Sequence, residues 1–271
     1  MPNQKSDIPT SKYANEIWRT SPDELSLPGM KSQIKKLLRQ VLIRLGIPLT
    51  KNIAYDIATE KILNQVLKPD SCCVDIGAHK GEILDVFIAN SPAGKHTGFE
   101  PIPNLCLSLK EKYQGKADIF PFALSDEIGT TTFNLVLDDP AYSGLKQRSY
   151  KTENPRIETI PVEVRTLDGV MAARDFKVAL MKIDVEGGEL GVMRGAQEIL
   201  TKDKPILIFE CGKGASEFYG TQPEDVYGFL THHSYFIFTL DGFLKGDRPL
   251  SMNDFVSCFH DGKEYYFVAT A

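Results

Sequence analysis

Short apolar segments of strand length alternate with helical segments along most of the chain after residue 54. The apolar runs include "SCCVDIG", "KHTGFE", "VALMKIDVEG" and "KPILIFE". Segments such as "EILDVFIAN" and "NLCLSLKEKY" follow them, with apolar residues three and four positions apart, as in amphipathic helices. Strands that are apolar along their whole length are covered on both faces. The sequence therefore predicts an α/β domain built on a doubly wound, mostly parallel sheet.

Other segments complete this prediction. "ADIFPFAL", "TTTFNLVL" and "TIPVEVRTL" are predicted strands, and "GELGVMRGAQEIL" and "PEDVYGFLTHH" are predicted helices, the second with Pro223 near its start. "YFIFTL" and "EYYFVAT" show no clear helical pattern between them, which favours an antiparallel hairpin at one sheet edge. Residues 138–158 lack a pattern, so they are either a lid or a disordered excursion. The lid hypothesis involves Tyr142, Ser143 and residues 146–150.

The first 50 residues differ from the rest, and we expect an N-terminal helical arm over residues 1–50 and one domain over residues 51–271. Within the arm, residues 31–45 predict an amphipathic helix with an apolar stripe and a basic face. Such a helix either packs on the domain or contacts an anionic membrane surface peripherally. The first interpretation is favoured because most amphipathic helices pack on their own domain.

Composition restricts the class of protein. The formal charge is −5 and the pI about 5.6, a poor match for a non-specific nucleic-acid binder. No apolar stretch is long enough to cross a bilayer and no secretory signal is evident, so a cytoplasmic location is expected. Five cysteines without a C-x-x-C pair and five histidines without zinc spacing predict neither a disulfide framework nor a structural metal.

"VDIGAHKGE", residues 74–82, ends the first predicted strand in a turn with two glycines, Gly77 and Gly81. The dinucleotide fingerprint G-x-G-x-x-G is missing, which disfavours a nicotinamide oxidoreductase. Asp75 beside the turn would repel a phosphate but suits the ammonium group of an amino acid. S-adenosylmethionine carries both an amino-acid end and a nucleoside, so the turn favours this cofactor.

Two neighbouring strand ends support the same cofactor. Glu100 ends the second predicted strand, where an acid can accept hydrogen bonds from ribose hydroxyls. Ser125 and Asp126 end the third predicted strand and could bracket an adenine with its exocyclic amine. Because ligands of open α/β sheets bind at the carboxyl ends of the strands, three adjacent ends predict one cofactor site.

These motifs resemble the FkbM-type S-adenosylmethionine-dependent methyltransferases. The matching stretches are "VDIGAHKGE", "GFEPIPNL", "FPFALSDEIGTTTF", "SGL", "VEVRTLDGV", "LMKIDVEGGELGVMRGAQEIL" and "ILIFE". The resemblance implies a class I methyltransferase fold with a seven-stranded sheet, and methyl transfer to a hydroxyl of a sugar, polyketide or similar metabolite. Asparagine is more usual in the family where this chain has His79. The implied cofactor-binding residues are Asp75, Gly77, Ala78, His79, Gly81, Glu100, Ser125 and Asp126.

The acceptor hydroxyl needs a base, and Asp184 at the end of "LMKID" is the best-placed candidate. Glu186 follows in the turn as a second catalytic candidate or as a helix-capping acid. Lys182, inside an apolar strand, needs a partner, predicted to be Glu210 or Glu186, in an architectural or catalytic ion pair. Asp184, Glu186 and Glu210 could alternatively bind magnesium or calcium, but Lys182 would compete for them.

We expect a small-molecule or glycan acceptor and no nucleic acid, and a homodimer stays open. Two alternatives to the main function are a non-catalytic S-adenosylmethionine-binding protein and a nucleic-acid methyltransferase, the latter supported by the basic segment over residues 31–45 alone.

Overall fold

The computed structural model describes residue 41, residues 46–150 and residues 154–271. The chain divides into one unit over residues 1–54 and a second over residues 55–271, and the second unit contains the features below. The predicted basic helix over residues 31–45 lies outside the described residues except for Val41. No described helix combines the length and the apolar character needed to cross a membrane.

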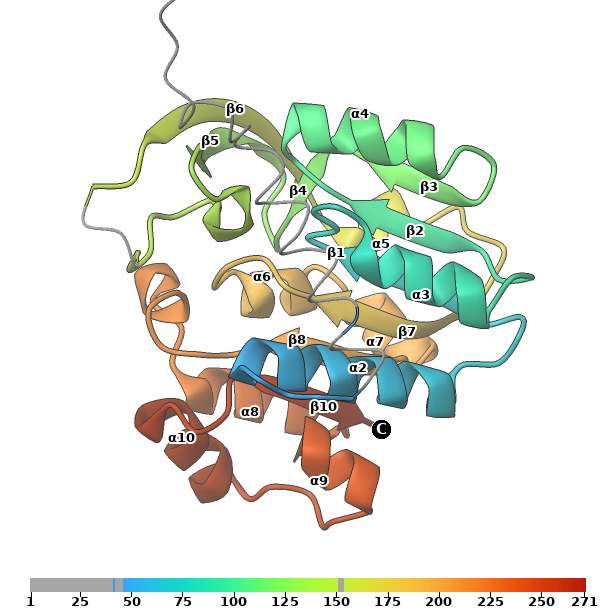
Figure 1. The fold of residues 1–271 in the computed structure, drawn as a ribbon, viewed down its shortest axis with the longest axis vertical. Helices are drawn as coiled ribbons and strands as arrows, with labels where there is room; N and C mark the ends of the chain where they lie inside the picture. Colours follow the sequence, from blue (N-terminus) through green and yellow to red (C-terminus); the bar gives the residue numbers. More distant parts are fainter. Residues whose placement is uncertain (1–40, 42–45, 151–153) are drawn as a thin grey trace, which may run out of the picture. The chain divides into compact units, whose positions relative to one another are not determined.

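A seven-stranded sheet forms the centre of the second unit (Figure 1). The strands occur in the spatial order β3-β2-β1-β7-β8-β10-β9, and β10 is antiparallel to both of its neighbours while the other pairs are parallel. This arrangement confirms the predicted doubly wound, mostly parallel sheet. The strands are β1 (Cys72–Ile76), β2 (His96–Phe99), β3 (Ala117–Phe120), β7 (Val178–Ile183), β8 (Ile206–Glu210), β9 (Phe236–Thr239) and β10 (Tyr266–Thr270).

The last two strands pair antiparallel at one edge of the sheet, as predicted, but they are not joined as a simple hairpin. Helices α9 (Leu240–Lys245) and α10 (Met252–Asp261) separate them along the chain. In the sheet, β10 lies between β8 and the edge strand β9. The sequence does contain the start signal of α10. Ser251 and Asp254 form a capping box, and Phe255 and Phe259 bury one helical stripe.

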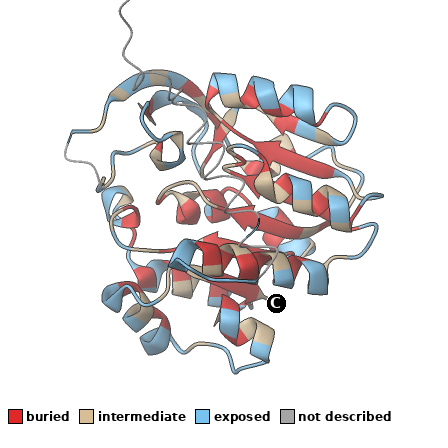
Figure 2. Cartoon of the chain, viewed as in Figure 1, coloured by how far each residue is buried: buried red, intermediate tan, exposed pale blue. Residues whose placement is uncertain are grey.

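Helices cover both faces of the sheet (Figures 1 and 2). Successive residues of β1 point to opposite faces, so Cys73 packs with Leu84 and Phe87, while Val74 and Ile76 pack on the other side. One face carries α2 (Lys51–Val66), α3 (Glu82–Asn90), α4 (Pro103–Lys112) and α9. The other carries α5 (Leu167–Val170), α6 (Glu189–Arg194), α7 (Gln197–Lys202), α8 (Pro223–His232) and α10.

A second sheet of three strands has the order β4-β6-β5, and its strand β4 follows directly after the carboxyl end of β3. Its strands are β4 (Phe122–Leu124), β5 (Gly129–Val136) and β6 (Ile157–Arg165). "ADIFPFAL" was predicted as one strand, but it is divided at Pro121, which cannot donate a ladder hydrogen bond. The short 3₁₀ helices η2 (Pro140–Tyr142) and η3 (Ser216–Tyr219) complete the described elements used below.

Candidate active site

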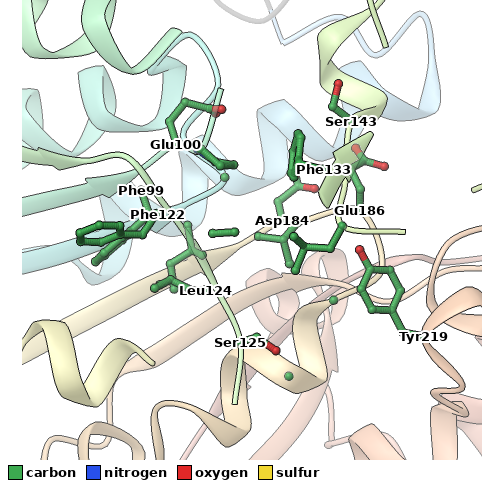
Figure 3. Close-up of a pocket in the computed structure, with 18 of the residues that line it drawn as sticks. Phe99, Glu100, Phe122, Leu124, Ser125, Phe133, Ser143, Asp184, Glu186 and Tyr219 are labelled. Carbon is green, nitrogen blue, oxygen red and sulfur yellow. The ribbon is translucent and has the colours of Figure 1, made fainter. Parts of the chain in front are cut away.

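A pocket opens at the carboxyl ends of β1, β2, β4 and β7 (Figure 3). Strand order reverses between β1 and β7, the place where open α/β sheets bind their ligands. The walls of the pocket come from these strand ends, from the small sheet and from the segment over residues 140–145. The labelled lining residues are Phe99, Glu100, Phe122, Leu124, Ser125, Phe133, Ser143, Asp184, Glu186 and Tyr219.

The loop after β1, residues 77–81, is here called the β1 loop. Gly77 has a φ of +83°, and the backbone N–H groups of Gly77 and Ala78 donate to the Phe99 carbonyl at 3.1 and 2.9 Å. A Cβ at Gly77 would lie 1.9 Å from the Asp184 carbonyl oxygen, and one at Gly81 would lie 2.4 Å from the Tyr113 hydroxyl. Both glycines are therefore required by packing within the protein, and Gly77 also lines the pocket.

His79 and Glu100 connect the β1 loop to the end of β2. The Glu100 carboxylate accepts hydrogen bonds from the backbone N–H groups of His79 and Ile102, both at 2.8 Å. Burial raises the pKa of Glu100 to about 7, although the two amides oppose this shift. His79 has a left-handed backbone with a φ of +47°, and its ring Nε2 is buried without a hydrogen-bond partner. Burial also lowers the pKa of His79.

Ser125 and Asp126 line the pocket from the end of β4, the second half of the segment that was predicted as the third strand. The Ser125 hydroxyl donates to Asp126 at 3.0 Å, and a Cβ at Gly191 in α6 would lie 2.9 Å from that hydroxyl. Phe122, Leu124 and Leu190 line the same part of the pocket. An apolar surface bordered by hydrogen-bonding groups suits a planar heteroaromatic ring.

The loop after β7, residues 184–188, is here called the β7 loop, and a buried cation anchors its start. The Lys182 ammonium is 2.7 Å from the Asp184 carboxylate, and the Tyr266 hydroxyl donates to the same carboxylate. The predicted partners of Lys182, Glu210 and Glu186, are thus wrong, because residues two apart in a strand share a face. Burial opposes ionisation of Asp184, but Lys182 and the hydrogen bonds outweigh it and lower the pKa to about 2.

Two further acids pack behind Asp184. Burial and the Asp184 charge raise the pKa of Glu210 well above its ordinary value, which favours the neutral form that can donate a hydrogen bond to Asp184. Glu189 accepts hydrogen bonds from the backbone N–H groups of Val185 and Gly187 at 3.0 and 3.2 Å. Burial raises the pKa of Glu189 to about 7. Glu189, and not Glu186, therefore holds the turn before α6.

The structure changes the metal alternative as well. Asp184, Glu189 and Glu210 bring their oxygens within 4.8 Å of one another, so Glu189 replaces Glu186 in the only such group among the described residues. The cation that the structure places on Asp184 is the Lys182 ammonium. Lys182 would therefore have to leave Asp184 before a metal ion could bind these three acids.

Glu186 lies on the opposite side of the pocket from Glu100 (Figure 3). It forms an ion pair with Arg148, and the exposed fractions of the two side chains are 15% and 13%. The Arg148 guanidinium also lies 5.1 Å from the centre of the Tyr142 ring. Glu186 has a left-handed backbone with a φ of +61°, which is uncommon for a residue with a side chain.

The segment over residues 139–150 occupies the position expected for the lid. Pro140, Ala141, Ser143 and Leu145 line the pocket. The backbone N–H of Lys146 donates to the Tyr219 hydroxyl at 3.1 Å, and that of Ser149 donates to the Gly214 carbonyl at 2.9 Å. Its movement on ligand binding stays a prediction.

The predicted site residues fall into two groups. Those that line the pocket are Gly77, His79, Glu100, Ser125, Asp126, Asp184 and Glu186. Those that support the lining from behind are Asp75, Ala78, Gly81, Lys182 and Glu210. Asp75 is 2% exposed, lies in β1 opposite Lys182, and has its pKa raised to about 7 by burial. Sequence analysis missed three residues around the loops, Glu189, Tyr219 and Tyr266, and included Arg148 only as part of the predicted lid.

The family model for the methyltransferase FkbM domain matches residues 75–237, more than half of the chain. The chain belongs to this family. It is 28% identical over 160 residues to the 2-O-methyltransferase NoeI of Sinorhizobium fredii, an alignment that covers 54% of this chain and 65% of that protein, slightly less than two thirds of its length.

Two solved methyltransferase structures are also similar. The methyltransferase FkbM of Methylobacillus flagellatus has 14% identity and a TM-score of 0.47, with 90% of this chain and 60% of that chain covered. SMU.1697c, a putative methyltransferase of Streptococcus mutans solved in complex with SAH, has 10% identity and a TM-score of 0.41, with 78% and 93% covered.

Proposed function

We propose that this chain is an S-adenosylmethionine-dependent methyltransferase that methylates a hydroxyl group of a small molecule or glycan. The observation that carries the proposal is the pocket of an FkbM-family domain with carboxylates at three strand ends around the switch point. Glu100, Asp126 and Asp184 are these acids. A negatively charged crevice suits a ligand with a sulfonium and an ammonium group.

The residues present fit this cofactor. Each Glu100 oxygen accepts one backbone N–H and keeps a lone pair, which a ribose hydroxyl could use. Ser125 and Asp126 offer acceptors for an exocyclic amine beside the apolar wall of Phe122 and Leu190. Asp75, Gly77, Ala78 and Gly81 would shape the turn that receives the amino-acid end.

The bound cofactor would supply a methyl group on a positively charged sulfur. The chain would orient the acceptor against it and exclude water, which is the main requirement of such a transfer. Asp184, with a pKa near 2, is a weak base, so we assign it the role of a fixed anion instead of the proton acceptor expected from the sequence. Lys182, Tyr266 and protonated Glu210 hold that anion in place.

The acceptor would enter on the side of Glu186. Phe133, Ser143, Leu145 and Tyr219 line this part of the pocket together with Glu186. The name of NoeI, a 2-O-methyltransferase, identifies an oxygen atom as the acceptor in that relative and supports a hydroxyl acceptor here. A polar and partly apolar wall of this kind suits a polyhydroxylated molecule.

Calorimetry tests the cofactor. We expect S-adenosylmethionine and S-adenosylhomocysteine to bind and NAD not to bind. Glu100→Gln should weaken binding about tenfold or more, about 1.4 kcal/mol, because it replaces one acceptor oxygen with an NH2 group that cannot accept a hydrogen bond from a ribose hydroxyl. Glu127→Gln, an exposed acid nearby, is the matched control. Binding of NAD in place of the sulfonium compound would refute the assignment.

Labelled methyl transfer tests the acceptor class. The protein is incubated with methyl-labelled S-adenosylmethionine and with separate fractions of small metabolites, glycans and RNA. Label in the first or second fraction is the expected outcome. Label in RNA would support the nucleic-acid alternative, and binding without transfer to any fraction would support the non-catalytic one.

A further inference from the structure

His79 lines the pocket, and its imidazole carries a buried nitrogen without a partner. Its backbone N–H is fixed by Glu100 at 2.8 Å, and its φ of +47° is uncommon for a residue with a side chain. The ring Nε2 has no hydrogen-bond partner in the structure. Buried polar atoms without partners are rare in proteins, and functional sites are one of the places where they occur.

The other pocket acids and the pocket tyrosine are already engaged. Asp184 binds Lys182 and Tyr266, and Glu186 binds Arg148. Glu100 accepts hydrogen bonds from two backbone amides, and Asp126 accepts one from Ser125. The Tyr219 hydroxyl accepts a hydrogen bond from the N–H of Lys146. Among the described residues that line the pocket, His79 thus has the basic nitrogen that still lacks a partner.

We propose that His79 is the catalytic base that takes the proton from the acceptor hydroxyl, an inference that rests on the proposed methyltransferase function. As the acceptor oxygen bonds to the methyl carbon, the carbon–sulfur bond breaks and its electron pair stays on sulfur, which becomes a neutral thioether. The hydroxyl proton passes to Nε2. The imidazolium formed there returns its proton to water when the products leave.

The charged groups around His79 suit this role. Lys80 and Glu82 face it from its own loop and from α3, Asp139 from the segment over residues 139–150, and Asp184 from the β7 loop. Burial and Lys80 lower the pKa of His79 more than the three carboxylates raise it, so the ring is neutral at pH 7 and can accept a proton. The same carboxylates would stabilise the imidazolium after transfer.

The substitution His79→Asn removes the base while keeping the backbone conformation of the turn. Asparagine tolerates a left-handed backbone and is neutral, but it cannot accept a proton near pH 7. Turnover is measured with the fraction that accepts label in the methyl-transfer experiment, and we expect kcat to fall about 10²–10⁴-fold. The acid limb of the pH profile of kcat/KM should disappear, while the affinity for S-adenosylmethionine stays unchanged. His260→Asn, an exposed histidine of α10, is the matched control and should behave as the wild type.

An NMR titration of ring-labelled histidine gives a readout independent of turnover. The resonance that is lost in His79→Asn should titrate below the ordinary histidine range, with S-adenosylhomocysteine bound and without it. A charged His79 at neutral pH, normal turnover of His79→Asn, or weaker cofactor binding with unchanged kcat would each overturn the inference. Failure of the wild type to bind S-adenosylmethionine or to methylate any fraction would instead contradict the proposed function.

Discussion

The β1 loop and the β7 loop meet in the same crevice, but different interactions hold them. The β1 loop is fixed mainly by backbone hydrogen bonds to Phe99 and by two glycines with positive φ, with Glu100 as a side-chain acceptor for the His79 N–H. The β7 loop is fixed by ionisable side chains: the Lys182 ammonium binds the Asp184 carboxylate, and Glu189 accepts hydrogen bonds from two N–H groups of the loop. The shape of the first loop should therefore depend on sterics, and that of the second on ionisation.

Removing the cation beneath the β7 loop should have the largest effect. Lys182→Met leaves Asp184 and buried Asp75 without their positive neighbour, and breaking one side of a buried ion pair costs about 3–5 kcal/mol. Denaturant unfolding measures the loss, and adding Asp184→Asn to the variant should recover part of it. Lys202→Met removes an exposed pair with Glu198 and should have no measurable effect. Equal effects of the two methionine variants would show that the charge is not what holds the β7 loop.

Gly77→Ala tests the steric basis of the β1 loop. The new Cβ would lie 1.9 Å from the Asp184 carbonyl oxygen, and the alanine would have to adopt a φ of +83°. Overpacking costs about 1–3 kcal/mol and a left-handed residue about 1–2 kcal/mol. Gly115→Ala has a φ of +72° and open space around the Cβ, so it should show the second cost alone in the same unfolding measurement. If both variants lost the same stability, the close approach to Asp184 would be irrelevant.

Glu189→Gln tests whether ionisation governs the β7 loop. The carboxyl has a pKa of about 7 when folded and an ordinary value of 4.5, so the folded state binds more protons between these values. The free energy of unfolding should fall as pH rises from about 5 to about 7.5, and Glu189→Gln should reduce this slope. Exposed Glu127→Gln is the control. A slope that is unchanged in Glu189→Gln would place the titration elsewhere.

Tyr219→Phe should have the smallest effect. It removes the hydrogen bond that ties the backbone of Lys146 to η3, worth about 0.5–1.5 kcal/mol. Trypsin cleavage after Lys146 should become up to about tenfold faster. Tyr227→Phe, which loses a hydroxyl bond to the Leu250 carbonyl far along the chain, serves as control. Cleavage at the wild-type rate would mean that Tyr219 does not hold the segment.

Local patterns predicted the fold well where the signals that begin and end an element lie within its own sequence. "EILDVFIAN" became α3 with those same ends, because its apolar spacing and the preceding glycine are both local. The division at Pro121 and the split of "GELGVMRGAQEIL" were missed. At Gly195, between α6 and α7, a Cβ would lie 2.2 Å from the Ser125 carbonyl, a contact that no window of sequence contains.

The candidate site was predictable to the extent that parallel strands share a carboxyl edge. Gly77, Glu100 and Asp184 converge for this reason. The two-residue period of a strand also indicates Asp184 as the partner of Lys182, although the prediction chose acids further along the chain. Arg148 and Tyr266 carry no comparable signal, because a long loop and an antiparallel strand bring them in.

The position of β10 has a consequence for how the protein matures. Tyr266 begins that strand, so Asp184 acquires its hydroxyl partner from a residue 82 positions further along. Until β10 inserts, β8 exposes an open edge and β9 has no neighbour in the sheet. A folding chain would therefore hold an incomplete crevice until this segment docks, so the crevice is completed by a non-local step.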